Sequence, residues 1–148
     1  MEAEIRNWFE YRVVKIHTVK FSFSDIDEAY VDSLLIDSKL NGELNVQVNV
    51  DREKSTMSFD ITSHITDTQK NELLVQHVAR TVYEVKGIDQ VYTVENDSYN
   101  IPDNLIIQLY AIAFSHARAL LATELSPTVF KDKYFLPVID PKDILSGE

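Results

Sequence analysis

One segment constrains the fold of this chain more than any other: NLIIQLYAIAFSHARALLATEL, from Asn104 to Leu125. An ordinary surface helix has one apolar stripe and one polar face, whereas the large apolar side chains of this segment point in all directions. Its few polar residues cannot form a solvated side. Because a chain of 148 residues seldom buries a helix completely by itself, we expect the second apolar face to pack against another subunit. The sequence therefore predicts an obligate oligomer.

The same helix is long enough to cross a membrane, since its residues rise about 1.5 Å each and reach about 30 Å in total. However, His116 and Arg118 lie in its second half, where a cation in the bilayer costs at least ~2.5 kcal/mol. No cluster of Lys or Arg flanks the segment on either side. We therefore expect no membrane span.

The composition is that of one globular domain over residues 1–148, with 45% hydrophobic and 26% charged residues. The net charge of −10 repels phosphate backbones, so we expect no nucleic-acid partner. It attracts basic partners, including cationic stretches of unfolded polypeptides, although solubility alone also explains an acidic surface. The N-terminus, MEAEIRNWFEYR, lacks the basic region and apolar run of a signal peptide, which predicts a cytoplasmic location.

Before the long helix, apolar residues alternate with polar ones, which is typical of half-buried antiparallel strands. The clearest strand is Leu44–Asp51, and Met57–Ile65 alternates in the same way after a charged turn, so these two strands should form a hairpin. An earlier strand is predicted from about residue 12 to residue 24, and a later one covers Glu72–Lys86. The side chains expected on one face of the earlier strand are His17, Val19, Phe21 and Phe23.

Two segments have no firm assignment. Residues Asp25–Leu40 form either a short helix or an irregular crossover, and residues 88–102 lead to Pro102 and Asp103, which suit the start of the long helix. A brief helical turn is expected after Pro141. The expected fold class is α+β, with a four-stranded antiparallel meander sheet followed by a long apolar helix and a short C-terminal helix.

Catalytic signals are weak. The chain has no cysteine, so disulfides, thiolate catalysis and Cys-based metal sites are excluded. Three glycines cannot build a phosphate-binding loop, and neither GxSxG nor HExxH occurs. The four histidines have no metal-ligand spacing, although neighbouring strands could bring His64 and His77 together. The sequence therefore predicts no enzyme, no cofactor and no metal site.

The chain carries more apolar surface than a simple core needs. Several aromatic residues lie in or beside segments without regular periodicity, where they either keep a groove partly open or cap the edges of the sheet. They are Phe21, Phe23, Tyr30, Phe130, Tyr134 and Phe135.

The order of these elements resembles the SecB family of protein-export chaperones. In that family a four-strand meander also precedes a long helix with a proline–asparagine start, which Pro102-Asp103-Asn104 matches. The helix end ARALL, residues 117–121, and the tail YFLPVIDP, residues 134–141, are similar to the family's helix end and its leucine–proline–isoleucine-rich segment. The strand that ends before Gly87-Ile88 aligns with the family's fourth strand. The resemblance covers about residues 12–145.

This resemblance implies a homotetramer, a dimer of dimers with the long helices sandwiched between sheet layers. It also implies ATP-independent holding of unfolded or nascent polypeptides in apolar grooves beside the crossover and the tail. The corresponding client-binding residues are Phe21, Phe23, Ile26, Tyr30, Leu34, Leu35, Phe130, Tyr134 and Phe135. The helix residues expected at the subunit interface are Leu105, Ile106, Leu109, Ile112, Ala113, His116 and Leu120.

Two departures concern the SecA motor, to which SecB proteins hand their clients. The family typically has a mobile acidic C-terminal tail, whereas this sequence ends soon after Leu145. Where the family's fourth strand presents an acidic residue to the motor, this chain has His77. SecA is therefore a doubtful partner. The alternatives are a dedicated SecB-like chaperone of one client, such as an antitoxin, and a small-molecule carrier or enzyme with an α+β pocket.

Overall fold

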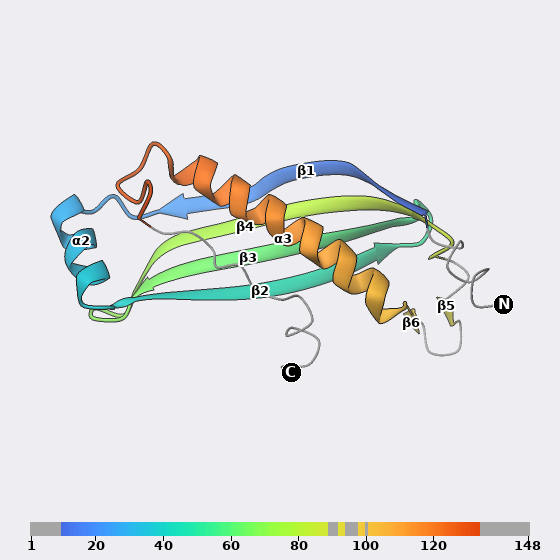
Figure 1. Ribbon diagram of the computed structural model, residues 1–148, viewed down its shortest axis with the longest axis horizontal. Helices are drawn as coiled ribbons and strands as arrows, with labels where there is room; N and C mark the ends of the chain where they lie inside the picture. Colours follow the sequence, from blue (N-terminus) through green and yellow to red (C-terminus); the bar gives the residue numbers. More distant parts are fainter. Residues whose placement is uncertain (1–9, 89–91, 94–97, 100, 134–148) are drawn as a thin grey trace.

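The α+β class is confirmed by a computed structural model that describes residues 10–88, 92–93, 98–99 and 101–133. One long sheet carries helix α3 diagonally across one face, and the short helix α2 lies at one end of the sheet (Figure 1). In chain order the elements are β1 (Glu10–Phe23), α2 (Glu28–Ile36), β2 (Leu40–Asp51), β3 (Thr56–Asp67), β4 (Glu72–Lys86), β5 (Tyr92–Thr93), β6 (Ser98–Tyr99) and α3 (Asp103–Leu125).

The order of the strands in the sheet is β1-β4-β3-β2. The predicted hairpin of β2 and β3 is present, and β2, β3 and β4 form an antiparallel meander. The first strand departs from the predicted meander, because it pairs with β4 instead of β2. The segment between β1 and β2, predicted as either a short helix or a crossover, is a crossover connection that contains the helix α2. It carries the chain from one edge of the sheet to the other.

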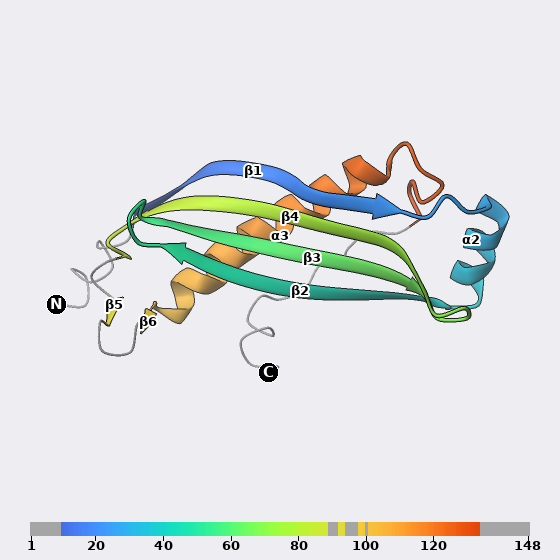
Figure 2. The ribbon, with the colours of Figure 1, turned by 180° about the vertical axis from the view of Figure 1, so that it is seen from behind.

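We call the face of the sheet that contacts α3 the inner face and the opposite one the outer face. Every second residue of β3 from Met57 to Asp67 is buried on the inner face, as period-two alternation predicts. The outer face has no helix over it among the described residues (Figure 2) and is mostly polar. There Arg80 of β4 donates two hydrogen bonds to Asp60 of β3, at 2.7 and 2.8 Å.

Strand β1 does not keep one set of side chains on one face, which corrects the prediction for His17, Val19, Phe21 and Phe23. The pairing with β4 shifts register at two places, after Val13 and after Thr18, so β1 contains two bulges. As a result His17 lies opposite Arg80, on the outer face, whereas Phe21 lies opposite His77, on the inner face. A bulge inserts one residue and so reverses the alternation, which the sequence pattern does not reveal.

Helix α3 begins and ends where the sequence predicts, within one residue. The residues that it buries recur mainly at intervals of four, so one stripe lies against the sheet: Leu105, Leu109, Ala113, Ala117, Leu121 and Leu125. Two polar contacts fix the helix there. Tyr83 donates a hydrogen bond of 2.6 Å to the carbonyl of Leu109, and Thr81 Oγ1 lies 2.9 Å from His116 Nδ1. By length and composition α3 could also span a membrane, and it is the single such helix among the described residues.

Candidate functional site

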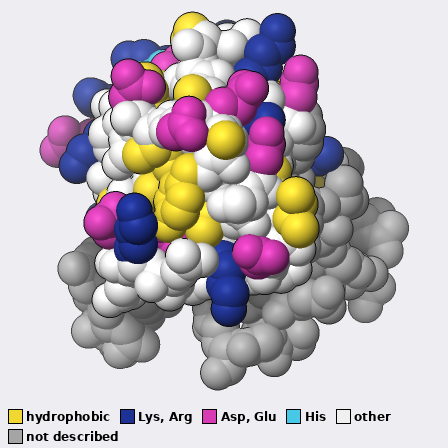
Figure 3. Space-filling view, turned by 90° about the vertical axis from the view of Figure 1, so that its left-hand side faces the viewer, with side chains coloured by type: hydrophobic (Ala, Val, Ile, Leu, Met, Phe, Trp, Pro, Cys, Tyr) yellow, Lys and Arg dark blue, Asp and Glu magenta, His cyan; other side chains and the backbone are white. Residues whose placement is uncertain are grey.

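Exposed apolar side chains gather at the end of the sheet that carries α2. Ile36, the last residue of α2, is 82% exposed, and its neighbour Leu35 is 38% exposed. Phe23 at the end of β1 and Leu73 at the start of β4 are 43% and 48% exposed; by their pairing Phe23 lies on the inner face, opposite Val75, and Leu73 on the outer face, opposite Thr66. Figure 3 looks at this end and shows hydrophobic side chains surrounded by acidic and basic ones. We call these four residues the end surface.

Helix α2, which carries Leu35 and Ile36 of the end surface, is joined to the sheet by hydrogen bonds. Tyr30 of α2 donates a hydrogen bond of 2.5 Å to the buried carboxylate of Asp67, at the end of β3. Asp67 also accepts hydrogen bonds from the backbone amides of Gln69 and Lys70. The ammonium group of Lys70 lies 4.5 Å from the centre of the Tyr30 ring, a cation–π contact. These contacts join α2 to the β3–β4 turn.

The same contacts shift two pKa values. The hydrogen bond to Asp67 raises the pKa of Tyr30 to about 12. Burial by itself would raise the pKa of Asp67, but the hydrogen bonds from Tyr30 and the two backbone amides outweigh it and lower that pKa below its ordinary value. At neutral pH the pair is therefore a neutral phenol bound to a carboxylate, which is a structural anchor for α2.

A second anchor joins α2 to the segment that follows α3. Asp32 of α2 accepts a hydrogen bond of 2.7 Å from the ammonium group of Lys133. Leu34 and Phe130, one from each segment, are both 1% exposed and belong to the hydrophobic core. Residues about 100 positions apart in the sequence thus hold the end of the molecule together.

The predicted client-binding residues divide into groups in the structure. Phe23 and Leu35 are exposed, whereas Leu34 and Phe130 support the surface from the core. The half-buried members are Phe21, Ile26 and Tyr30. The Phe21 ring stacks on the Phe23 ring with centroids 5.6 Å apart. Tyr134 and Phe135 lie outside the described residues.

Sequence reasoning missed Ile36 and Leu73 as part of this surface. The signal for Ile36 was present in the run Leu34-Leu35-Ile36 at the end of a short helix, because a nine-residue helix with one buried stripe cannot cover three consecutive apolar side chains. Leu73 carries no such signal, since it looks like any other residue of an alternating strand. Its exposure follows from its place at the start of β4.

The predicted interface residues of α3 also divide. Leu105, Leu109 and Ala113 are buried against the chain's own sheet, and their contact with another subunit stays a prediction. Four others are half-buried on the flanks of the helix: Ile106, Ile112, His116 and Leu120. The most exposed line of the helix carries small or polar residues, among them Ser115 and Thr123, whose hydroxyls donate hydrogen bonds to carbonyls one turn earlier.

The histidines do not converge. His64 lies opposite Gln76 on the outer face, whereas His77 lies opposite Ser63 on the inner face, so the two point away from each other. Among the described residues no group of His, Asp and Glu side chains could hold a metal ion. His77 is fully buried, 3.0 Å from the Thr18 hydroxyl, and burial lowers its pKa to about 4. The side chain at this position therefore lies in the core.

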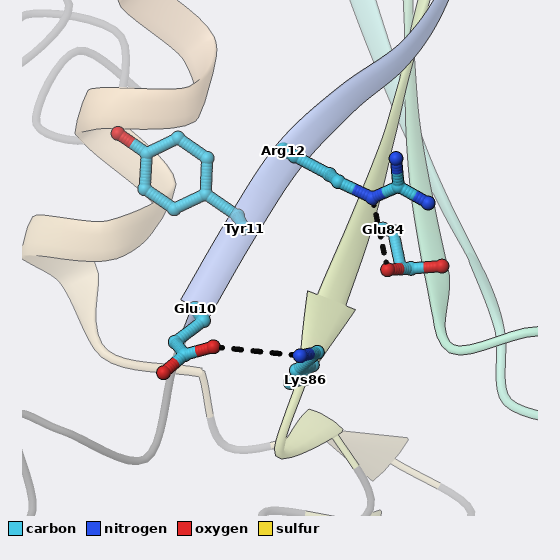
Figure 4. A pocket seen from close by; sticks show the side chains of 5 residues that line it. All are labelled: Glu10, Tyr11, Arg12, Glu84 and Lys86. Atoms are coloured by element: carbon cyan, nitrogen blue, oxygen red, sulfur yellow. Dashed lines mark hydrogen bonds and ion pairs between the residues drawn. The ribbon is translucent and has the colours of Figure 1, made fainter.

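A shallow pocket lies at the other end of β1 (Figure 4). Its cavity volume is about 120 Å³, and Tyr11 forms part of its wall. The charged side chains around it neutralise one another in pairs: Arg12 lies 3.1 Å from Glu84, and Lys86 lies 3.6 Å from Glu10. The chemistry of this pocket, two exposed ion pairs and a phenol, does not assemble a nucleophile with a base and an orienting group.

Sequence comparison identifies no relative, because neither a protein-family model nor a curated protein matches this chain. Structure comparison finds a similar fold. The SecB-like chaperone Rv1957 of Mycobacterium tuberculosis, solved in complex with a ChAD peptide from the antitoxin Rv1956 HigA1, superposes with a TM-score of 0.51 at 10% sequence identity. The superposition covers 93% of this chain and 94% of that one. The chain therefore has a SecB-like fold.

A second similar structure is a protein of unknown function from Streptococcus agalactiae. It has a TM-score of 0.43 at 12% identity and covers 88% of this chain and 98% of its own. At 10% identity the comparison with Rv1957 establishes a shared fold, and function has to be argued from the surface.

Proposed function

We propose that this protein is an ATP-independent chaperone that binds unfolded or nascent polypeptides. The observation that carries the proposal is the end surface, where Phe23, Leu35, Ile36 and Leu73 expose between 38% and 82% of their area on anchored elements. An apolar side chain that is fixed and exposed in this way costs free energy in water unless a partner covers it. A non-native polypeptide supplies such a partner, because its own apolar side chains are still exposed.

The surface favours a polypeptide over a small molecule for a geometric reason. Small-molecule sites are concave and combine apolar walls with a few convergent polar groups. The end surface instead contains Ile36, the last residue of α2, which is 82% exposed and so is not enclosed by other described side chains. A flexible chain can follow such a surface, whereas a rigid small ligand would leave most of its own area in water.

The similar protein Rv1957 supports this proposal, since it is a SecB-like chaperone bound to a peptide from an antitoxin. The function could take two forms, which differ in the range of clients. In the first, the protein holds many non-native clients, as an export chaperone of the cytoplasm would. In the second, it protects one dedicated client, such as an antitoxin. The SecB family presents an acidic residue to SecA at the position where this chain has the buried His77. This difference favours a chaperone that does not transfer its client to SecA.

We propose further that the chain assembles into a homotetramer through the outward side of α3. The flanks of that side carry Ile106, Ile112 and Leu120, each half-buried in the single chain. The hydroxyls of Ser115 and Thr123 are already bonded within the helix, so a partner can cover them at little cost. Ile112→Asp should dissociate the assembly, because an unpaired buried charge costs several kcal/mol. An unchanged mass in solution would contradict this arrangement.

The test of the function is suppression of aggregation of a reduced, slowly folding protein, without nucleotide, as this protein is titrated in. We expect saturation near a fixed client ratio, and we expect the double variant Phe23→Ser/Ile36→Ser to need about tenfold more protein, since it removes two apolar contacts. Val48→Ser is the matched control, because Val48 is 40% exposed but lies on β2, away from the end surface.

The outcomes distinguish a general chaperone from a dedicated one. Suppression by the parent protein and the control, but not by the double variant, supports a general chaperone. No suppression of generic clients, together with tight binding of one peptide, supports a chaperone dedicated to one client. No binding of any non-native chain by an intact assembly would contradict the proposal.

A further inference from the structure

The outer face of the sheet divides into two halves by charge. All Lys and Arg residues of the four long strands lie on β1 and β4, and they are Arg12, Lys15, Lys20, Arg80 and Lys86. The outer face of β2 instead carries Glu43 and Asp51. No helix covers this face among the described residues (Figure 2). The cations are therefore gathered on one side of an uncovered face, in a protein whose net charge is −10.

Two of these cations have no partner within the part of the chain that the structure describes. Lys15 and Lys20 of β1 are exposed, and neither forms an ion pair or a hydrogen bond with another described residue. The others are neutralised by carboxylates: Arg12 by Glu84, Arg80 by Asp60, and Lys86 by Glu10. The two lysines are thus the charges on this face that a partner can neutralise.

The pairing of β1 with β4 places an apolar side chain beside each lysine. Lys15 lies opposite Val82 and Lys20 lies opposite Val78, and both valines are half-buried on the outer face. The two valines are four positions apart on β4, and a strand rises about 3.4 Å per residue, so the lysines lie about 14 Å apart along the sheet. We call Lys15, Lys20, Val78 and Val82 the basic face.

We propose that the basic face binds an extended acidic segment of a partner protein, in which two carboxylates lie four positions apart with an apolar side chain midway between them. Residues i, i+2 and i+4 of an extended chain point to the same side, and the carboxylates of such a segment are also about 14 Å apart. Each carboxylate can then lie beside one lysine while the apolar side chain covers the valines. The inference goes beyond the proposed function, because it assigns a second surface and a partner other than a non-native client.

A nucleic acid fits the basic face less well than an acidic polypeptide. DNA carries one negative charge per about 1.7 Å of its axis, so a site for it needs many cations along a stripe. Two unpaired lysines do not supply them, and the net charge of −10 repels a long polyanion. A short acidic segment escapes most of this repulsion, because charges beyond about 8 Å are screened at about 0.15 M salt.

The corresponding face of a second copy also fits less well. Its carboxylates on β2, Glu43 and Asp51, are eight positions apart, so they lie about 27 Å from each other, twice the spacing of the lysines. The carboxylate of Asp60 on β3 is already bonded to Arg80. This face of a second copy can therefore neutralise one lysine but not both at once.

The experiment titrates the full-length protein, labelled at its valine methyl groups, with nine-residue peptides and follows the NMR chemical shifts at about 0.15 M salt. One peptide has the core Glu-Thr-Val-Thr-Glu, and the other has lysine in place of each glutamate. We expect the glutamate peptide to shift the methyl signals of Val78 and Val82, because both valines lie beside the lysines that it contacts. We expect the lysine peptide to leave these signals unchanged.

Removal of the two charges should weaken the binding. Lys15→Gln/Lys20→Gln should raise the dissociation constant of the glutamate peptide about fivefold, because two exposed ion pairs are lost. Lys15→Arg/Lys20→Arg keeps both charges and should keep the parent affinity. Lys39→Gln/Lys54→Gln is the matched control, since it removes the same net charge from the turns at the two ends of β2. It should leave the dissociation constant unchanged.

Signals of Val78 and Val82 that do not move, or an equal loss of affinity in the control variant, would overturn the inference. A shift of the same signals by a single-stranded DNA would also overturn it, because the face would then recognise phosphates. A lower mass of the assembly for Lys15→Gln/Lys20→Gln would show that a second copy covers the face, which contradicts the inference too. None of these measurements involves a non-native client, so the proposed function is tested separately by the suppression of aggregation.

Discussion

Two strands of the same sheet, β3 and β1, differ in burial although β1 carries the larger number of apolar residues. In β3 every second residue is buried, and Phe59 and Ile61 have no exposed area. In β1 no residue is buried, although valines, an isoleucine and phenylalanines occur along it. The difference lies in their neighbours. Strand β3 has a strand on each side and α3 over its inner face. Strand β1 pairs with one strand among the described residues, and α3 crosses the sheet diagonally (Figure 1).

This comparison separates what holds the fold from what remains available for binding. The side chains of β3 and β4 that face α3 form the core, and those of β1 and the end of α2 keep apolar area in water. Exposed apolar residues on a regular, hydrogen-bonded strand are not loose structure. They form a fixed surface that a flexible partner can cover.

The largest effect is expected for Phe59→Ala in β3. The Phe59 ring has no exposed area and contacts the Tyr83 ring edge-on at 5.7 Å, so its removal leaves a cavity and lowers the free energy of unfolding by about 3–5 kcal/mol. Urea denaturation measures the change. Ile61→Val at the next buried position is the milder partner and should cost about 1 kcal/mol. A loss below about 1 kcal/mol for Phe59→Ala would contradict the assignment of the core.

The next effect concerns pH. Burial lowers the pKa of His77 to about 4, from 6.5 in the unfolded chain. The unfolded state therefore binds a proton first as the pH falls, so the stabilisation is complete above about pH 6.5 and is lost progressively toward pH 4, by up to about 3 kcal/mol. His77→Gln should flatten this dependence. A smaller slope should persist, because burial lowers the pKa of His116 too. Identical pH profiles for the two proteins would contradict the role of His77.

The smallest effect is expected on β1. Ile16→Thr keeps the β-branched shape and changes a side chain that is 43% exposed, so the free energy of unfolding should change by less than about 0.5 kcal/mol. Urea denaturation of Ile16→Thr and Phe59→Ala under the same conditions compares the two changes in the free energy of unfolding. A loss comparable with that of Phe59→Ala would mean that β1 is covered in the folded protein, and the comparison between the two strands would fail.

The sequence predicted the elements well because their signals are local. Alternation of apolar and polar residues located β2, β3 and β4, and the run of apolar residues from Asn104 to Leu125 located α3. The pairing of β1 with β4 could not be predicted in this way, since strand order depends on contacts between distant residues. The bulges in β1 could not be predicted for a related reason. A bulge is defined by how a strand pairs with its neighbour, so the amino-acid type of the inserted residue does not reveal it.

The predicted client-binding residues include both exposed and core positions. Phe23 and Leu35 are exposed where the sequence placed a groove, whereas Leu34 and Phe130 lie in the core beneath it. Aromatic and aliphatic side chains look the same in a sequence whether they form a surface or support it. Only the packing of α2 against the segment after α3, through Asp32 and Lys133, decides between the two.

The central claim is that non-native polypeptide binds at the end surface, and site-specific photo-crosslinking tests it most directly. A photoreactive phenylalanine analogue would replace Ile36 in one protein and Val48 in another, and each would be irradiated with an unfolded client. Both positions are exposed, but Val48 lies on β2. We predict strong crosslinking from position 36 and little from position 48. Equal crosslinking from both positions, or none from position 36 while the client is still bound, would contradict the claim.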